Sequence, residues 1–117
     1  ARAQVANNAK ADFFLSIHCN AASTSGAEGF EVYHYPGSTK GAMLATKIAD
    51  AYAIASDLKR RKVASANFQV LRDTAMPAAL IELGFLTNKA DCALLREPAF
   101  LDKIALGIAF GILDMRA

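Results

Sequence analysis

Two residues combine chemistry suited to hydrolysis with a position at the end of an apolar run. Residues 13–17 (FFLSI) lead directly into His18, and residues 78–81 (AALI) lead directly into Glu82. A short apolar run bounded by polar residues is typical of a buried strand, and open α/β sheets bind ligands beyond the carboxyl ends of such strands. We therefore interpret His18 and Glu82 as candidate members of one site.

Each of these side chains has a specific chemical use and a plainer alternative. A neutral imidazole is a good zinc ligand, so His18 is a candidate metal ligand, whereas a packed core histidine is the alternative. Glu82 lies among apolar neighbours, and desolvation raises the pKa of a carboxyl group toward the range of a general base at neutral pH. The alternative for Glu82 is helix capping or pairing with Arg72.

A catalytic zinc ion needs about three protein ligands, and the residues near His18 do not supply them. His34 lies in an aromatic segment, which favours packing on a sheet face over coordination. Cys19 would point to the opposite face of the strand from His18. The sequence contains no Cys-x-x-Cys, His-Glu-x-x-His or glycine-rich phosphate-binding motif.

Composition bounds the class of protein. The 117 residues suit one domain, and 54% hydrophobic with 21% charged residues indicates a globular chain. The net charge of +2 is too small to indicate nucleic-acid binding. No apolar run reaches 18 residues, so we predict no membrane span. The two cysteines predict free thiols, with Cys19 buried, and no signal peptide is visible.

Periodicity and turn residues predict alternating helices and strands. We expect helices over residues 1–10, 40–58, 88–95 and 98–112, and strands over residues 12–18, 29–35, 68–71 and 78–82. Ser38 or Thr39 would cap the long helix, and Asn88 with Asp91 resembles a capping box. Intermixed strands that are apolar on both faces predict a three-layer α/β sandwich with a mixed, mostly parallel central sheet flanked by helices.

The basic run at residues 59–62 (KRRK) is interpreted as the solvated end of the long helix, where cations are favoured. Nothing aromatic interleaves the run, so we do not expect nucleic-acid contact. An anionic polymer remains an open candidate partner.

Four blocks, in order, resemble a known family. Residues 11–21 (ADFFLSIHCNA) closely resemble the "ADLFISIHANA" block of the zinc-dependent N-acetylmuramoyl-L-alanine amidases, the Amidase_3 family. Residues 29–33 (GFEVY) and 68–72 (FQVLR) resemble its "GFEVYY" and "FxVLR" strands. Residues 76–88 (MPAALIELGFLTN) resemble its "MPAVLVELGFLSN" signature. The resemblance covers essentially the whole chain.

The resemblance implies roles for individual residues. His18 would be a zinc ligand and Glu82 the catalytic glutamate. The family's other two ligands, a histidine in a Gly-His-Gly-Gly-type turn and a glutamate on the next helix, lie upstream, and neither motif is present in residues 1–117. We therefore expect residues 1–117 to be an amidase catalytic domain that lacks its N-terminal part. Cys19 stands where the family usually has alanine, and we assign it no role.

The expected function is hydrolysis of the amide bond between N-acetylmuramic acid and L-alanine in peptidoglycan. Zinc would polarise the carbonyl and acidify water, Glu82 would move the proton, and Asn20 and Arg72 would orient substrate. The resemblance implies a monomer that acts in the cell wall, periplasm or extracellular space. It leaves open a bacterial autolysin or a phage endolysin. The alternative is a non-catalytic peptidoglycan-binding or interaction domain with an incomplete metal site.

Overall fold

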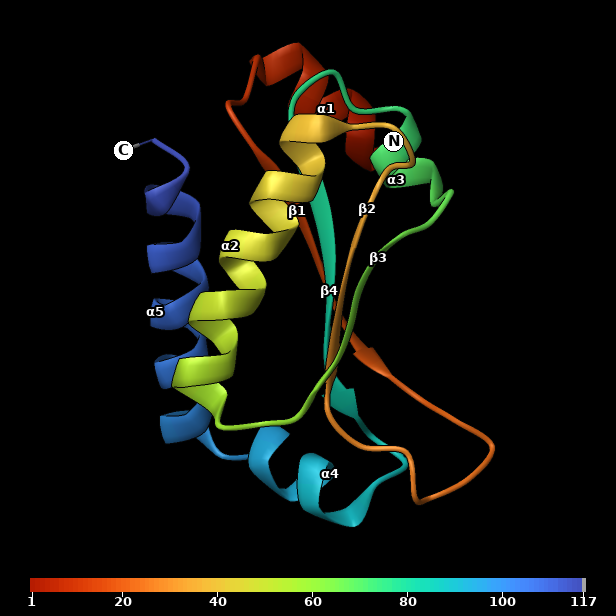
Figure 1. The fold of residues 1–117 in the computed structure, drawn as a ribbon, viewed down its shortest axis with the longest axis vertical. Coiled ribbons are helices and arrows are strands. Elements are labelled where there is room, and N and C mark those ends of the chain that lie inside the picture. The colour runs from red at the N-terminus through yellow and green to blue at the C-terminus, as the bar shows by residue number, and fades with distance from the viewer. Residues whose placement is uncertain (117) are drawn as a thin grey trace.

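A mixed four-stranded sheet organises the computed structural model, which describes residues 1–116 (Figure 1). In spatial order its strands are β1 (Phe14–Asn20), β4 (Ala78–Phe85), β2 (Phe30–His34) and β3 (Arg60–Ser65). β1 pairs with β4 in parallel, β2 pairs with β3 in parallel, and β4 pairs with β2 antiparallel. The predicted mixed, mostly parallel sheet is therefore confirmed.

Helices lie on both faces of this sheet, which confirms the predicted three-layer arrangement. One face is covered by α2 (Thr39–Ser56) and α5 (Pro98–Asp114) (Figure 1). The other face carries the short α3 (Gln69–Arg72), which α1 (Arg2–Ala9) contacts. The short helix α4 (Lys89–Leu95) follows β4 at the end of the sheet where that strand finishes. None of the helices in residues 1–116 is long and apolar enough to cross a bilayer.

The main core forms between the sheet and the helices α2 and α5. Phe30 and Val32 of β2 alternate into it, as do Ile81 and Leu83 of β4. Tyr52 of α2 is fully buried there, and its hydroxyl donates to the Leu83 carbonyl oxygen at 2.7 Å. A second, smaller apolar cluster on the opposite face contains Leu71, Ala78 and Leu80. Alternate residues of β2, and likewise of β4, therefore face opposite sides of the sheet.

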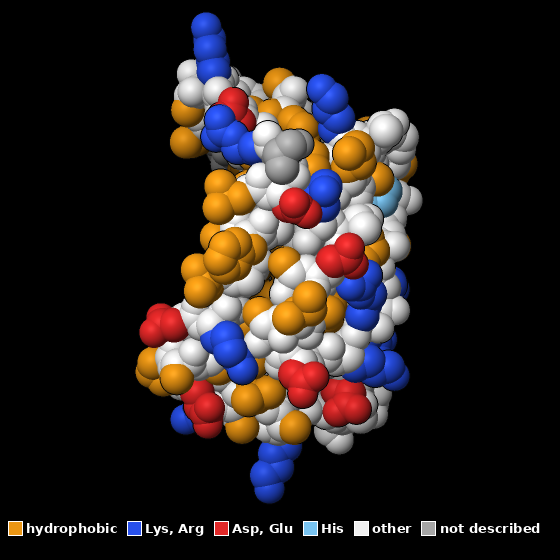
Figure 2. All heavy atoms as spheres, turned by 60° about the vertical axis from the view of Figure 1, so that its left-hand side comes forward, with side chains coloured by type: hydrophobic (Ala, Val, Ile, Leu, Met, Phe, Trp, Pro, Cys, Tyr) orange, Lys and Arg blue, Asp and Glu red, His pale blue; other side chains and the backbone are white. Residues whose placement is uncertain are grey.

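Two glycines let α5 approach α2 closely. A Cβ atom at Gly111 would lie 2.8 Å from the Ile48 Cα atom, and one at Gly107 would lie 2.5 Å from the Ala55 Cβ atom. An ion pair between Lys47 and Asp114, 3.2 Å apart, joins the same helices. The outer surface of α5 keeps exposed apolar side chains among charged ones (Figure 2).

The prediction of a strand at residues 68–71 is wrong, because Gln69–Arg72 form the one-turn helix α3. The Phe68 carbonyl oxygen accepts hydrogen bonds from the backbone N–H groups of Leu71 and Arg72, which closes the turn. Leu71 is buried against the second cluster, where a helical turn presents it as well as a strand would. The β-branched and aromatic composition of this segment was outweighed by that tertiary contact.

The basic run is not a helix end. The helix α2 stops at Ser56, where Asp57 adopts the left-handed conformation with φ of 57°. Arg60 then begins β3, the outermost strand next to β2. Charged side chains on an edge strand discourage pairing with another chain, which accounts for this composition.

The strand β1 is less buried than its apolar composition predicts. Within residues 1–116 it pairs only with β4, so it forms an edge of the sheet. Ile17 is 56% exposed and Cys19 is exposed, so the prediction of a buried Cys19 is wrong. Cys19 and Cys92 are both free thiols in the described chain, as expected.

The glycine contacts predict that Gly111→Ala destabilises the fold. Alanine favours helix by about 1 kcal/mol, but overpacking against the Ile48 backbone should cost about 1–3 kcal/mol. Urea unfolding followed by circular dichroism would measure the net loss. Leu106→Ala on the exposed side of α5 is the control and should be close to neutral. A more stable Gly111→Ala protein would contradict the close packing.

Candidate active site

Three ionisable side chains form a row across the sheet. In the strand register, His18 of β1 pairs with Glu82 of β4, and Glu82 pairs with Glu31 of β2. Directly paired residues share a face, and neighbouring strands are about 5 Å apart. Tyr33 and Leu80 of the smaller apolar cluster share this face, so the row lies on the side opposite α2 and α5.

The carboxyl group of Glu82 has no hydrogen-bond donor in residues 1–116. Its Oε1 atom is buried and has no hydrogen-bond partner in residues 1–116. Burial raises the pKa of this carboxyl group, the nearby His18 lowers it, and the negative charge of Glu31 raises it, so the net shift is upward. The alternative pairing with Arg72 is not present, because Arg72 Nε donates to Asp73 Oδ1 at 3.1 Å. An upward shift of the pKa is the direction that a general base near neutral pH requires.

His18 presents an exposed imidazole at the end of the row. Its Nε2 atom lies 2.8 Å from Ser16 Oγ, two residues earlier on the same face of β1. That hydrogen bond orients the ring and leaves Nδ1 as the nitrogen that could bind a metal ion. Residues 1–116 contain no group of three His, Cys, Asp or Glu side chains placed to hold a metal. His18 therefore fits one ligand position, but these residues alone do not make a complete zinc site.

The carboxylate of Glu31 differs from that of Glu82, because hydrogen-bond donors contact both of its oxygens. Oε1 accepts from Tyr33 Oη at 2.6 Å and from Asn20 Nδ2 at 3.1 Å. Oε2 accepts from Arg61 Nε at 2.9 Å. The donors come from β2, β1 and β3, so one carboxylate that is 5% exposed ties three strands together beside Glu82.

This network separates the proton affinities of the two glutamates. Burial raises the pKa of Glu31, but hydrogen bonds from Tyr33 and Arg61, together with the charges of Lys62 and Arg61, more than offset it and lower the pKa below 4.5. The pKa of Tyr33 is raised by burial and by its bond to the Glu31 carboxylate. Glu31 thus stays ionised while its neighbour Glu82 binds a proton more readily.

Asn20 and Arg72, the two expected substrate-orienting residues, lie in different places. Asn20 ends β1 beside the row, where its Nδ2 contacts Glu31 and its Oδ1 accepts from the Ala21 backbone N–H at 2.9 Å. Arg72 ends α3, which packs near the beginning of β4, whereas Glu82 is the fifth residue of that strand. The structure brings His18, Glu82 and Asn20 together and does not join Arg72 to them.

Hydrogen bonds join the loop after β1 to the turn after β4. The Ala22 N–H donates to Thr87 Oγ1 at 3.1 Å, and Asn88 Nδ2 donates to the Ser25 carbonyl oxygen at 3.0 Å. Asn88 also caps α4 by accepting from the Asp91 N–H, as predicted. These bonds connect the ends of β1 and β4.

The carboxylate of Asp91 does not complete the expected capping box. Its Oδ2 atom accepts instead from the backbone N–H groups of Gly29 and Phe85, at 2.9 and 3.0 Å. Gly29 has φ of +103°, and a Cβ atom there would lie 2.3 Å from the Lys59 carbonyl oxygen. Asp91 thereby fixes the start of β2 against the end of β4, which sets the spacing of Glu31 and Glu82.

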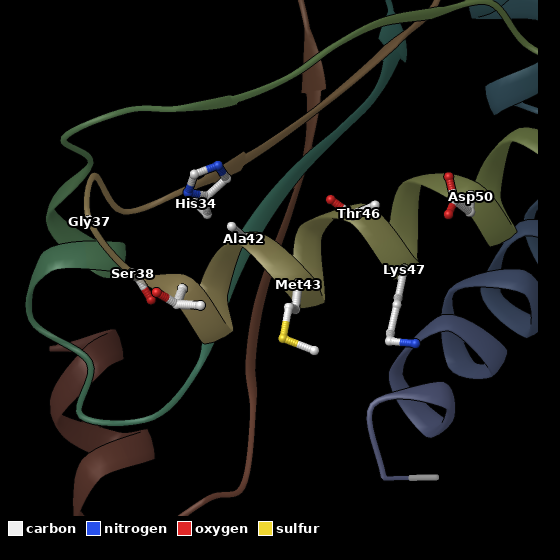
Figure 3. A pocket seen from close by; sticks show the side chains of 9 residues that line it. His34, Gly37, Ser38, Ala42, Met43, Thr46, Lys47 and Asp50 are labelled. Atoms are coloured by element: carbon white, nitrogen blue, oxygen red, sulfur yellow. The ribbon is translucent and has the colours of Figure 1, made fainter.

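A surface hollow lies elsewhere on the molecule. A shallow depression of about 690 Å³ runs beside the first half of α2 and is lined by Met43, Thr46 and Lys47 (Figure 3). His34 borders it at the far end of β2, half-buried, with Nδ1 3.2 Å from the Tyr35 carbonyl oxygen. The position of His34 agrees with the prediction of a sheet-face residue that is separate from His18.

Glu31 and Arg61 are the members of the site that sequence reasoning missed. The alternation of Phe30 and Val32 with Glu31 and Tyr33 does place a carboxylate on the polar face of β2, so a signal for Glu31 exists. The sequence gives no such signal for Arg61, because the basic run that contains it does not resemble a strand.

Comparison with known proteins shows the family to which the chain belongs. The family model Amidase_3, described as N-acetylmuramoyl-L-alanine amidase, matches residues 1–114. The chain therefore belongs to this amidase family, as the four sequence blocks indicated.

The relatives include bacterial and phage proteins. The N-acetylmuramoyl-L-alanine amidase CwlM of Bacillus licheniformis is 44% identical over 114 residues, which are 95% of this chain and 43% of CwlM. The endolysin of Bacillus phage SPP1 is 39% identical over 120 residues, covering 97% of this chain and 44% of the endolysin. The chain thus spans less than half the length of these relatives.

Solved structures share the fold. The catalytic domain of CwlV from Bacillus (Paenibacillus) polymyxa superposes with a TM-score of 0.91 at 37% identity, and an amidase from Clostridium difficile 630 with 0.92 at 36%. Each alignment covers 97% of this chain and 62% of the solved one.

The hydrogen bonds of Glu31 predict a pH-dependent contribution to stability. Its folded pKa lies below 4.5, so the ionised carboxylate stabilises the fold above that pH, and the contribution is lost as the pH falls through the folded pKa. Glu31→Gln should lower the free energy of unfolding by about 1–3 kcal/mol at pH 7. The difference from wild type should shrink below about pH 4.5.

Urea unfolding at pH 7, 5 and 4 measures this difference. Glu28→Gln, at an exposed position in the loop after β1, is the control and should change little. A constant difference between wild type and Glu31→Gln at all three pH values would contradict the assignment.

Proposed function

We propose that the protein containing this chain is a peptidoglycan hydrolase that cleaves the amide bond between N-acetylmuramic acid and L-alanine. The observation that carries the proposal is Glu82, a carboxylate with a buried, unpartnered oxygen, paired in register with His18 within a member of the amidase family. The names of the relatives, amidases and an endolysin, support the same reaction.

In the proposed reaction Glu82 moves the proton. Its carboxylate accepts a proton from the attacking water and then donates it to the nitrogen of the leaving L-alanine. The raised pKa suits both halves of this transfer, because the protonated form must persist until the amine departs. Asn20 holds the start of the loop beside the reacting centre, and a direct substrate contact by Arg72 stays a prediction.

The family resemblance implies zinc, and His18 would supply one of its protein ligands through the ring that Ser16 orients. When bound, zinc supplies a Lewis acid that polarises the scissile carbonyl and acidifies water. The remaining protein ligands have to come from outside residues 1–116, since these residues hold no three-ligand group. We accordingly propose that residues 1–117 form part of a larger zinc-dependent catalytic domain.

A hydrolase of this specificity acts where peptidoglycan is, so we propose the cell wall, periplasm or extracellular space as its location and a monomer as its working form. The second candidate function is a non-catalytic peptidoglycan-binding domain. The incomplete ligand set of the described residues is the observation that favours it. Zinc stoichiometry of the full-length natural protein separates the two, because the hydrolase needs one bound ion.

Replacing the proposed base should abolish turnover and leave the metal in place. In the full-length natural protein loaded with zinc, Glu82→Gln keeps the size of the side chain but cannot accept the proton. Hydrolysis of purified muropeptide should fall at least about 100-fold, with zinc content unchanged. Glu97→Gln at the exposed start of α5 is the control. Turnover by Glu82→Gln near the wild-type rate would eliminate Glu82 as the base.

The two histidines of the chain offer a matched pair for the ligand assignment. His18→Ala in the full-length natural protein should lower zinc occupancy, because an imidazole ligand is lost. His34→Ala, beside the separate hollow, should leave occupancy unchanged. Elemental analysis after dialysis against a metal-free buffer makes the measurement. Equal zinc content in wild type and His18→Ala would reject His18 as a ligand.

A further inference from the structure

The side chain of Arg61 reaches from β3 across β2 to the end of β4, the strand that carries Glu82. It starts on β3, its Nε atom donates to Glu31 on β2 at 2.9 Å, and its Cζ atom lies 4.9 Å from the centroid of the Phe85 ring on β4. Phe85 pairs in register with Asn20, whose amide also contacts Glu31. The guanidinium group is therefore laid over the strand that carries Glu82.

The guanidinium group keeps binding capacity after these contacts. Within residues 1–116, Nε of Arg61 has a hydrogen-bond partner, the Glu31 carboxylate, whereas Nη1 and Nη2 have none. The side chain of Arg61 is 34% exposed. The two terminal nitrogens, Nη1 and Nη2, form a planar fork whose spacing matches a carboxylate. One edge of the group is thus anchored by protein, and the other can take a ligand.

The local charge also favours an anion. Glu31 is the carboxylate paired with Arg61, and Lys62 adds a second cation whose Nζ atom lies 5.9 Å from the Tyr33 ring centroid. Arg60, the preceding residue, is turned away and pairs with Asp50 at 2.8 Å. On β2 and β3 the network therefore combines the carboxylate of Glu31 with two cations, so an anion that contacts Arg61 meets no excess of negative charge there.

We propose that Arg61 binds a free carboxylate of the substrate's stem peptide and so positions the scissile amide at Glu82. This inference rests on the proposed amidase function and names a specificity-determining residue for it. The stem peptide that follows the muramoyl group carries carboxylates beyond the scissile bond, at its second residue and at its end. Glu31 and Phe85 act as positioning residues that hold the guanidinium plane fixed before substrate arrives.

Three synthetic muramoyl tripeptides test the proposal on the wild-type, full-length, zinc-loaded protein. The first has a free carboxylate on the second residue alone, the second has one on the third residue alone, and the third has both amidated. If Arg61 forms a bidentate, charge-assisted contact, one of the two peptides with a free carboxylate should be preferred. Its kcat/KM should be about 10- to 100-fold above that of the fully amidated peptide. The identity of that acid tells which carboxylate Arg61 holds.

Variants then assign the preference to Arg61. Arg61→Gln should bring the ratio of kcat/KM values between the preferred acid and the amidated peptide close to 1, mainly through KM. Arg61→Lys keeps the charge but loses the fork, so it should retain only part of the ratio. Arg60→Gln removes a neighbouring charge that pairs on the other side, and should keep the wild-type ratio and rate. A purely structural role for Arg61 would change all three substrates equally.

Equal cleavage of all three peptides by the wild-type protein would overturn the proposal while leaving the amidase function standing. A preference that survives in Arg61→Gln would overturn it as well. If the wild-type protein cleaves none of the peptides, the proposed function fails, and the role of Arg61 fails with it.

Discussion

Two carboxylates that face each other across neighbouring strands receive opposite environments, and the proposed chemistry depends on that difference. Glu31 accepts three hydrogen bonds, one of which is also its ion pair with Arg61, so it stays ionised. Glu82 has a buried oxygen with no partner in the described residues, and the fixed negative charge of Glu31 stands beside it. Burial is the main cause of the raised pKa of Glu82, and the negative charge of Glu31 adds to it. Environment, more than residue type, assigns the two roles.

The sheet topology makes this juxtaposition possible. Because β1 and β4 run in parallel while β2 runs antiparallel to β4, the ends of the first two strands meet the start of the third. Asp91 fixes that meeting point by accepting from backbone groups at both strand ends. The opposite face of the sheet is filled by α2 and α5, which lets the site face remain polar without weakening the main core.

The sequence predicted the two residues on which the proposal depends, because each ends an apolar run and strand ends carry function in open sheets. The sequence also predicted the three layers, because the hydrophobic periodicity of each helix and strand can be recognised without knowing which strands pair. It failed where tertiary contacts outweigh local preference. A strand was predicted at residues 68–71, but Gln69–Arg72 form a helical turn whose Leu71 packs against Leu80. The basic run around Arg61 was interpreted as a helix end, but it pairs with β2 as a strand. The role of Arg61 could not be predicted, because only the fold brings it to Glu31 and Phe85.

The most direct test of the account is mass spectrometry of the products when the full-length, zinc-loaded protein hydrolyses a purified muropeptide in water enriched in oxygen-18. The account predicts an intact stem peptide with a free L-alanine amino group. It also predicts one heavy oxygen in the carboxylate left on the muramoyl group, because water activated by Glu82 attacks that carbonyl. Cleavage at a different bond, or binding of the muropeptide without cleavage, would contradict it.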